Sequence, residues 1–163
     1  MHSRRLKTFT TNFDPTEDRI RLDCALAVGS QAQIFLTNRL SKIFITELSK
    51  QVERLSDVKN SNELVQDFVR NSRLNREPVS ISVKETEKWL TNSIDFVKFD
   101  KKIRIIFRDN QTHAVHLEAD EVILRNMLDI FLKTFIQAGW ETNVFPAWVD
   151  VSKAETVSSG FIH

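Results

Sequence analysis

The sequence predicts an α+β fold built from two related ββα-type halves, with antiparallel sheet packed against two long amphipathic helices. The supporting observation is a pattern of strand, strand and helix that occurs at residues 19–22, 31–37 and 40–55 and again at 102–107, 113–118 and 122–136. Few residues are identical between the two sets, so the pattern fits a duplication or a chance recurrence of a common unit. The halves could share one sheet with both helices on one face, or form two sheets packed through the helices.

The length and composition suit one compact domain. The chain has 163 residues, of which 41% are hydrophobic and 28% are charged, as in ordinary globular proteins. We expect an N-terminal half at residues 1–70, a connector with short helical and strand segments at 71–93, a C-terminal half at 94–150 and a mobile tail at 151–163.

Alternating apolar residues predict the strands of the N-terminal half. Residues 6–13 are weakly β-like, and residues 19–28 alternate between apolar and charged side chains before a hairpin turn at Gly29. Residues 31–37 return as a strand. An amphipathic helix follows at 40–55, which either Thr37 or Asn38 could cap.

The middle of the chain gives weaker signals. Asn60 and Glu63 resemble a capping box before a short helix that ends near Leu74. Residues 84–90 are compatible with one or two helical turns that carry Trp89. In the C-terminal half, strands are expected at 94–99, 102–108 and 113–118. A second long helix is expected at 122–138, with Gly139 as its C-terminal stop.

The second long helix is apolar over most of its circumference. Only a strip that includes Arg125, Asp129 and Lys133 is polar. A helix of this kind must be covered on more than one side, either at the centre of the monomer or at a subunit interface. The candidate interaction surface comprises Leu128, Phe131, Phe135, Trp140, Phe145 and Trp148.

Several classes of protein are disfavoured by composition. The net charge of +1 provides no field that would hold a polyanion, and Cys24, the single cysteine, is expected to be a buried, inert thiol. No secretory signal, membrane-spanning segment or phosphate-binding glycine motif is present, so we expect a cytoplasmic protein without a cofactor.

The densest group of ionisable residues lies at 113–121. His116 and Glu118 are expected on one face of a strand, with Asp120 close by, and they are weak candidates for a metal site or an acid–base site. The sequence is more typical of an acidic helix N-terminus beside surface histidines, because carboxylates there complement the free N–H groups.

Three arginines give a weak signal for nucleic-acid binding. Arg19, Arg21 and Arg104 could lie on one exposed sheet surface, where nearby Phe rings could stack on bases. The alternative is a solvated sheet face balanced by Asp23 and Asp109.

These observations favour a non-catalytic protein-interaction or assembly module, expected to be a homodimer or to bind a protein partner and to be without membrane contact. Two alternatives remain open. One is a ligand-binding or metal-binding protein or enzyme that uses residues 113–121, and the other is a nucleic-acid accessory protein.

Overall fold

The computed structural model describes residues 2–56, 61–72, 78–81 and 86–149. Within these ranges the chain forms seven strands, joined in one mixed, curled sheet, and three helices. The predicted α+β class is therefore confirmed, but the helices number three rather than two. Part of the expected connector, residue Asn60, residue 150 and the expected tail at 151–163 lie outside the described residues.

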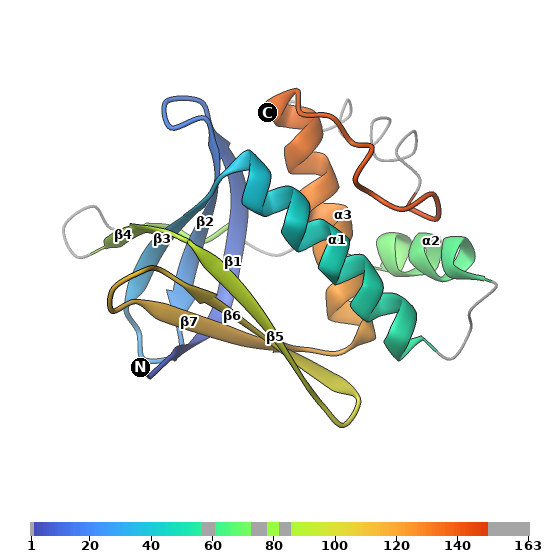
Figure 1. The fold of residues 1–163 in the computed structure, drawn as a ribbon, viewed down its shortest axis with the longest axis horizontal. Coiled ribbons are helices and arrows are strands. Elements are labelled where there is room, and N and C mark those ends of the chain that lie inside the picture. Colours follow the sequence, from blue (N-terminus) through green and yellow to red (C-terminus); the bar gives the residue numbers. More distant parts are fainter. Residues whose placement is uncertain (1, 57–60, 73–77, 82–85, 150–163) are drawn as a thin grey trace.

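The N-terminal half is a three-stranded antiparallel meander followed by a helix (Figure 1). The side chains that face the core, such as Ile20, Leu22 and Cys24, alternate with outward polar residues, as the sequence predicts. The elements are β1 (Arg4–Asp14), β2 (Arg19–Leu26), β3 (Gln31–Leu36) and α1 (Asn38–Leu55).

The C-terminal half repeats the order of a meander and a helix. Its helix begins after Asp120, whose side chain caps it, and ends at Gly139 in the left-handed conformation. The elements are β5 (Ser93–Phe99), β6 (Lys102–Arg108), β7 (Ala114–Ala119) and α3 (Glu121–Ala138).

Two short elements connect the halves: α2 (Asn62–Ser72) and β4 (Glu87–Leu90). The expectation of helical turns at residues 84–90 is wrong for the part that the structure describes, since β4 pairs in parallel with β3 from Ala32 to Phe35. The backbone groups of β4 that face β3 are satisfied by this non-local partner, which local sequence does not reveal.

The sheet order is β4-β3-β2-β1-β7-β6-β5. The expectation of purely antiparallel sheet is wrong, because β3 with β4 and β1 with β7 are parallel pairs. Within the sheet, the described strands of the two halves pair with each other at Arg4 and Arg5, which lie beside Val115 and His116. Because the first strand of one half meets the last strand of the other, this order does not show a symmetric duplication, and the duplication stays a prediction.

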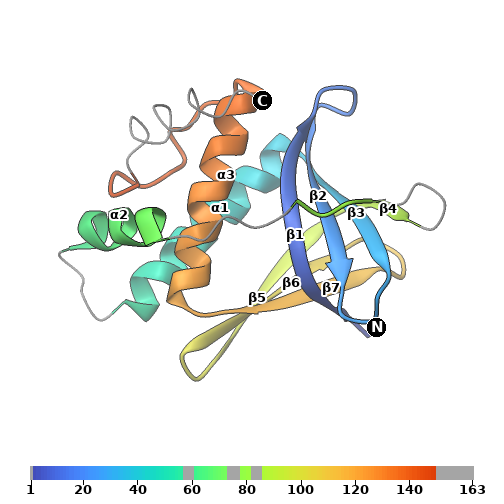
Figure 2. The same ribbon diagram turned by 180° about the vertical axis from the view of Figure 1, so that it is seen from behind.

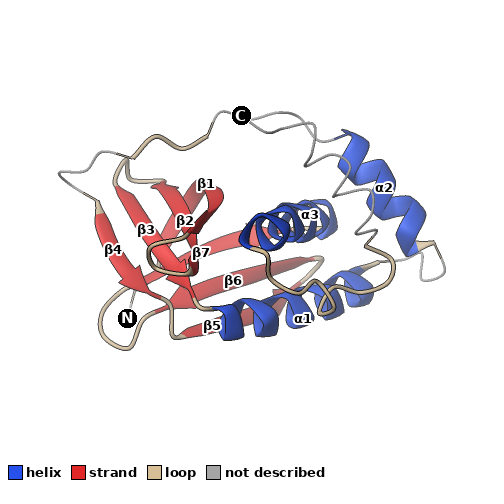
Figure 3. Ribbon diagram, turned by 90° about the horizontal axis from the view of Figure 1, so that it is seen from above, coloured by secondary structure: helices blue, strands red, loops and turns tan. Residues whose placement is uncertain are grey.

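The sheet curls around the helices, and its two halves are turned relative to each other (Figure 2). Viewed from above, α3 and α1 lie on the inner side of the sheet, and α2 lies beyond α3 (Figure 3). One hydrophobic core joins the inner faces of both sheet halves to α1 and α3. The described part of the chain therefore has one shared core rather than two.

The sequence leaves two places for the second long helix, and the structure puts it at the centre of the monomer. Leu128, Phe131 and Phe135 are fully buried against this chain's own sheet and helices. Its polar strip is also covered: Arg125 and Asp129 are fully buried beneath α2. The described part of the chain therefore covers the apolar side of this helix around Leu128 itself, while Val122 and Ile123 at the start of the helix are exposed.

Candidate functional site

The contact between α2 and α3 is made mainly by polar side chains. Arg125 of α3 donates from Nη2 to Asn62 Oδ1 at 2.7 Å and from Nε to Glu121 at 3.0 Å. Gln66 of α2 donates to the backbone oxygen of Arg125 at 2.9 Å. A fully buried guanidinium is tolerated only when hydrogen bonds and charge replace water in this way.

A second ion pair fixes the other end of α2. Arg70 Nε lies 2.7 Å from Asp129 Oδ1, and both side chains are nearly inaccessible to solvent. Lys133 Nζ lies 3.4 Å from the other oxygen of Asp129. The polar strip of α3 thus serves as the docking site for α2, which explains why its polar side chains are buried.

The outward side of α2 is apolar. Leu64 and Phe68 are each 72% exposed and lie four residues apart, so they are neighbours on one helix face. Val69 is the one buried apolar side chain of this helix, and the other buried residues of the helix are Gln66 and Arg70. The helix therefore buries polar residues and exposes apolar ones, which is the reverse of the usual amphipathic arrangement.

The residues expected to form an interaction surface are mostly inside the molecule. Phe135 makes edge-to-face contacts with Trp140 at 5.2 Å and Phe145 at 5.1 Å, and Phe145 is buried. Trp148 is partly buried and donates to Glu53 of α1 at 3.1 Å. The C-terminal aromatic segment folds back over this chain's own helices, so it does not offer the exposed surface expected from sequence.

The residues at 113–121 do not converge on one point. His116 Nδ1 lies 2.6 Å from Ser3 Oγ, Glu118 pairs with Arg104 at 2.6 Å, and Asp120 caps α3. Burial lowers the pKa of His116, assisted by the positive charge of Arg104. In the described ranges, no three His, Cys, Asp or Glu side chains are arranged to hold a metal ion.

His113 belongs to a separate cluster, which sequence analysis missed. Its Nδ1 lies 2.7 Å from Asp109, and its ring stacks on Trp89 of β4 with centroids 5.6 Å apart. Arg4 of β1 donates to both carboxylate oxygens of Glu87 on β4. In the sheet, β2 and β3 separate β1 from β4, so it is the curl of the sheet that brings these side chains together. The spacing of residues along the sequence does not predict such contacts.

The three candidate arginines share the outer sheet face, but each is neutralised by a carboxylate. Arg21 bonds Asp23 at 2.9 Å and Asp14 at 3.2 Å. Burial disfavours its charged form, but these ion pairs outweigh burial and raise the pKa of Arg21. The other two arginines pair with Glu17 and Glu118, and Arg104 lies in the other half of the sheet. They do not form one continuous basic surface.

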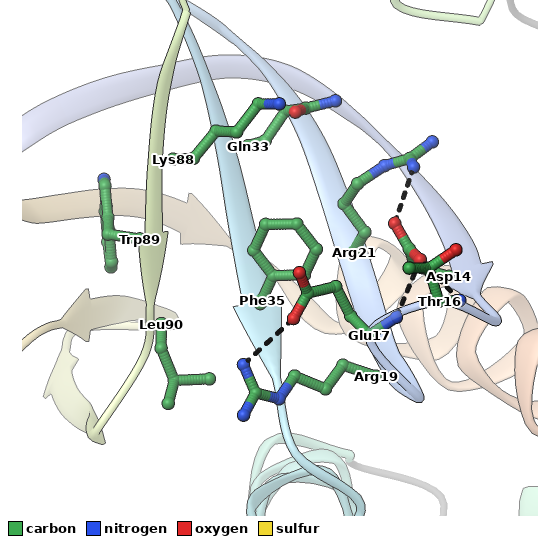
Figure 4. Close-up of a pocket in the computed structure, with 10 residues that line it drawn as sticks. All are labelled: Asp14, Thr16, Glu17, Arg19, Arg21, Gln33, Phe35, Lys88, Trp89 and Leu90. Carbon is green, nitrogen blue, oxygen red and sulfur yellow. Dashed lines mark hydrogen bonds and ion pairs between the residues drawn. The ribbon is translucent and has the colours of Figure 1, made fainter.

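A pocket of about 430 Å³ opens on this outer face, between the turn after β1 and strand β4 (Figure 4). Phe35 lies at its centre, because its backbone pairs with Arg21 on one side and Leu90 on the other. Gln33 and Lys88 are paired in the same way and extend together at one end. The pocket brings together side chains from β2, β3, β4 and the turn, and only Arg19 and Arg21 were candidates from sequence.

One wall of the pocket is rigid. Asp23, which is nearly buried, accepts hydrogen bonds from Arg21, Asn12 and Gln33. Asp14 accepts from the backbone N–H of Glu17 and of Thr16 at 3.0 Å, and these bonds, with that from Arg21, lower its pKa. The turn after β1 and the guanidinium of Arg21 are therefore held in place by the protein's own hydrogen bonds, without a ligand.

None of the helices described here has the length and apolarity needed to cross a membrane. Comparison with known proteins finds no family model that matches the chain, and neither a curated protein nor a solved structure with significant similarity to it.

Proposed function

We propose that the chain is a non-catalytic protein-interaction module that binds a second copy of itself through the outward face of α2. The observation that carries the proposal is the exposure of Leu64 and Phe68 on a helix whose opposite side is held by buried polar contacts. Burying a side chain of this size gains about 1.5–3 kcal/mol, so two of them can contribute substantially to association.

The geometry of α2 supports this use of the helix. Apolar residues four positions apart are the usual anchors of a helix that packs against a groove or against its symmetry mate. Hydrogen bonds and ion pairs hold α2 on α3, so its outer side chains are presented on a fixed element. The originally expected surface around Phe131 takes no part in this proposal, because it is buried.

The test is the association state of the Leu64→Glu/Phe68→Glu variant, measured by sedimentation equilibrium over a range of protein concentrations. We expect the wild type to dimerise and the variant to be monomeric, with an unchanged far-ultraviolet circular dichroism spectrum, because both side chains are exposed in the monomer. Val28→Glu is the matched control, since Val28 is 77% exposed in the turn between β2 and β3 and should leave the dimer intact.

A monomeric wild type at the highest concentration would contradict the proposal, as would a dimer that the double variant leaves unchanged. Cytoplasmic residence and a common origin of the two halves stay predictions that these measurements do not address.

A further inference from the structure

We infer that the pocket on the outer face of the N-terminal sheet binds a nucleotide, with the base against Phe35 and the phosphate beside Lys88. The volume of about 430 Å³ lies within the range of small-molecule sites. This site is separate from α2, and the inference does not depend on the proposed self-association.

The floor of the pocket suits a flat ring. Phe35 and Leu90 are partly exposed apolar side chains on adjacent strands, and Figure 4 shows the ring of Phe35 in the middle of the pocket. Stacking of a base on an aromatic ring contributes about 1–3 kcal/mol and is tolerant of the identity of the base.

The two ends of the pocket differ in chemistry. Lys88 is exposed, and its amine makes no hydrogen bond or ion pair with the part of the chain that the structure describes. The amide of Gln33, which donates to Asp23, extends to the same end. A phosphate there would gain a charge-assisted hydrogen bond. At the other end Glu17 and Arg19 form an exposed pair at 3.4 Å, which supplies an acceptor and a donor for the polar edge of a base.

The structure supports a site for one nucleotide better than a continuous binding surface for a nucleic-acid strand. Arg104 lies in the other half of the sheet, and the arginines on both sides are already paired with carboxylates. The same chemistry could nevertheless come from a free mononucleotide or from one nucleotide of a single strand. Salt dependence separates these sources, because contacts to several phosphates weaken strongly as salt rises.

The experiment is calorimetric titration of the full chain with adenosine monophosphate, uridine monophosphate and an oligothymidylate, each at low and high salt. We expect Lys88→Glu to weaken mononucleotide binding by about tenfold, the loss of one charge-assisted contact. Phe35→Leu should weaken it by about tenfold through lost stacking while keeping an apolar side chain on the floor.

Lys101→Glu is the matched control, because Lys101 is exposed in the turn between β5 and β6 and carries the same charge. It should leave mononucleotide affinity unchanged. Tighter, salt-sensitive binding of the oligothymidylate would assign the nucleotide to a strand, and equal or weaker binding would assign it to a free nucleotide. The inference is overturned if none of the three probes binds, or if Lys88→Glu and Lys101→Glu have the same effect.

Discussion

Arg125 shows how one side chain can have a role opposite to the one its chemistry predicts. An arginine in the polar strip of a helix is expected at the surface, yet it is fully buried and bonds Glu121, Asn62 and Gln66. Its guanidinium also lies 5.3 Å from the ring of Trp148. Because its partners come from α2 and α3 together, this one residue joins two elements that are distant in sequence.

Replacing Arg125 with Met should destabilise the protein by roughly 3 kcal/mol, because the buried partners lose their donor. Urea denaturation monitored by circular dichroism measures this loss. Arg39→Met is the control: Arg39 is exposed at the start of α1, and its replacement should change stability by less than about 0.5 kcal/mol. Equal losses in both variants would show that the buried network contributes nothing specific.

Cys24 should not react with thiol reagents in the folded protein. It lies buried in β2, and burial raises the pKa of its thiol far above the usual range, so the reactive thiolate does not form. Titration with Ellman's reagent should show no free thiol under native conditions and one thiol in denaturant. Rapid labelling of the native protein would contradict this placement.

His116 should make the protein less stable as the pH falls. Burial, with the charge of Arg104, lowers its pKa in the folded state, whereas the unfolded chain keeps a value of about 6.5. Below about pH 6.5 the unfolded state therefore takes up a proton first, and stability falls until the folded pKa is passed. His116→Gln should flatten this part of the stability curve, and His2→Gln, at the exposed N-terminus, should leave it unchanged.

At the scale of the elements, the local sequence predicted the ends of the two long helices most reliably. Thr37 and Gly139 occupy the positions expected for them, and Thr37 accepts the backbone N–H of Leu40 at 3.1 Å. Caps depend on one side chain and the adjacent backbone, so few distant residues can override them.

Gly139→Ala should therefore lower the stability by about 1 kcal/mol, because φ is 71° at Gly139 and a Cβ is disfavoured there. An added Cβ would contact nothing within 4 Å, so backbone strain is the whole effect. Gly139→Asn should cost less, since Asn adopts this conformation more readily. Thermal unfolding of both variants checks the ranking, and equal losses would argue against a backbone cause.

β4 and α2 show where prediction at this scale failed. β4 is four residues long, and its strand character depends on pairing with β3, more than fifty residues away in the chain. The helical pattern of α2 was visible, but its orientation was not, because Leu64 and Phe68 are as apolar as Val65 and Val69. Only the buried partners on α3 decide which face points inward.

At the scale of the whole molecule, α3 is enclosed by the sheet, α1, α2 and the segment that ends at Val149. Leu128→Asp should consequently prevent folding rather than only disturb association, since a charge would replace a fully buried side chain. Val122→Asp on the same helix should be tolerated, because Val122 is 53% exposed. Far-ultraviolet circular dichroism distinguishes the two, and a folded Leu128→Asp protein would contradict this central position.

Sequence by itself determined the class of fold, most of the alternating strands, and the helix ends at Thr37 and Gly139. These features follow from side-chain periodicity and from contacts within a few residues. Tertiary structure alone decided the parallel pairs, the curl that brings Glu87 to Arg4, the burial of Arg125 and Asp129, and the pocket around Phe35. Each of these features depends on groups that are far apart in the chain. These groups come into contact, and so stabilise one another, only when the sheet has folded around α3.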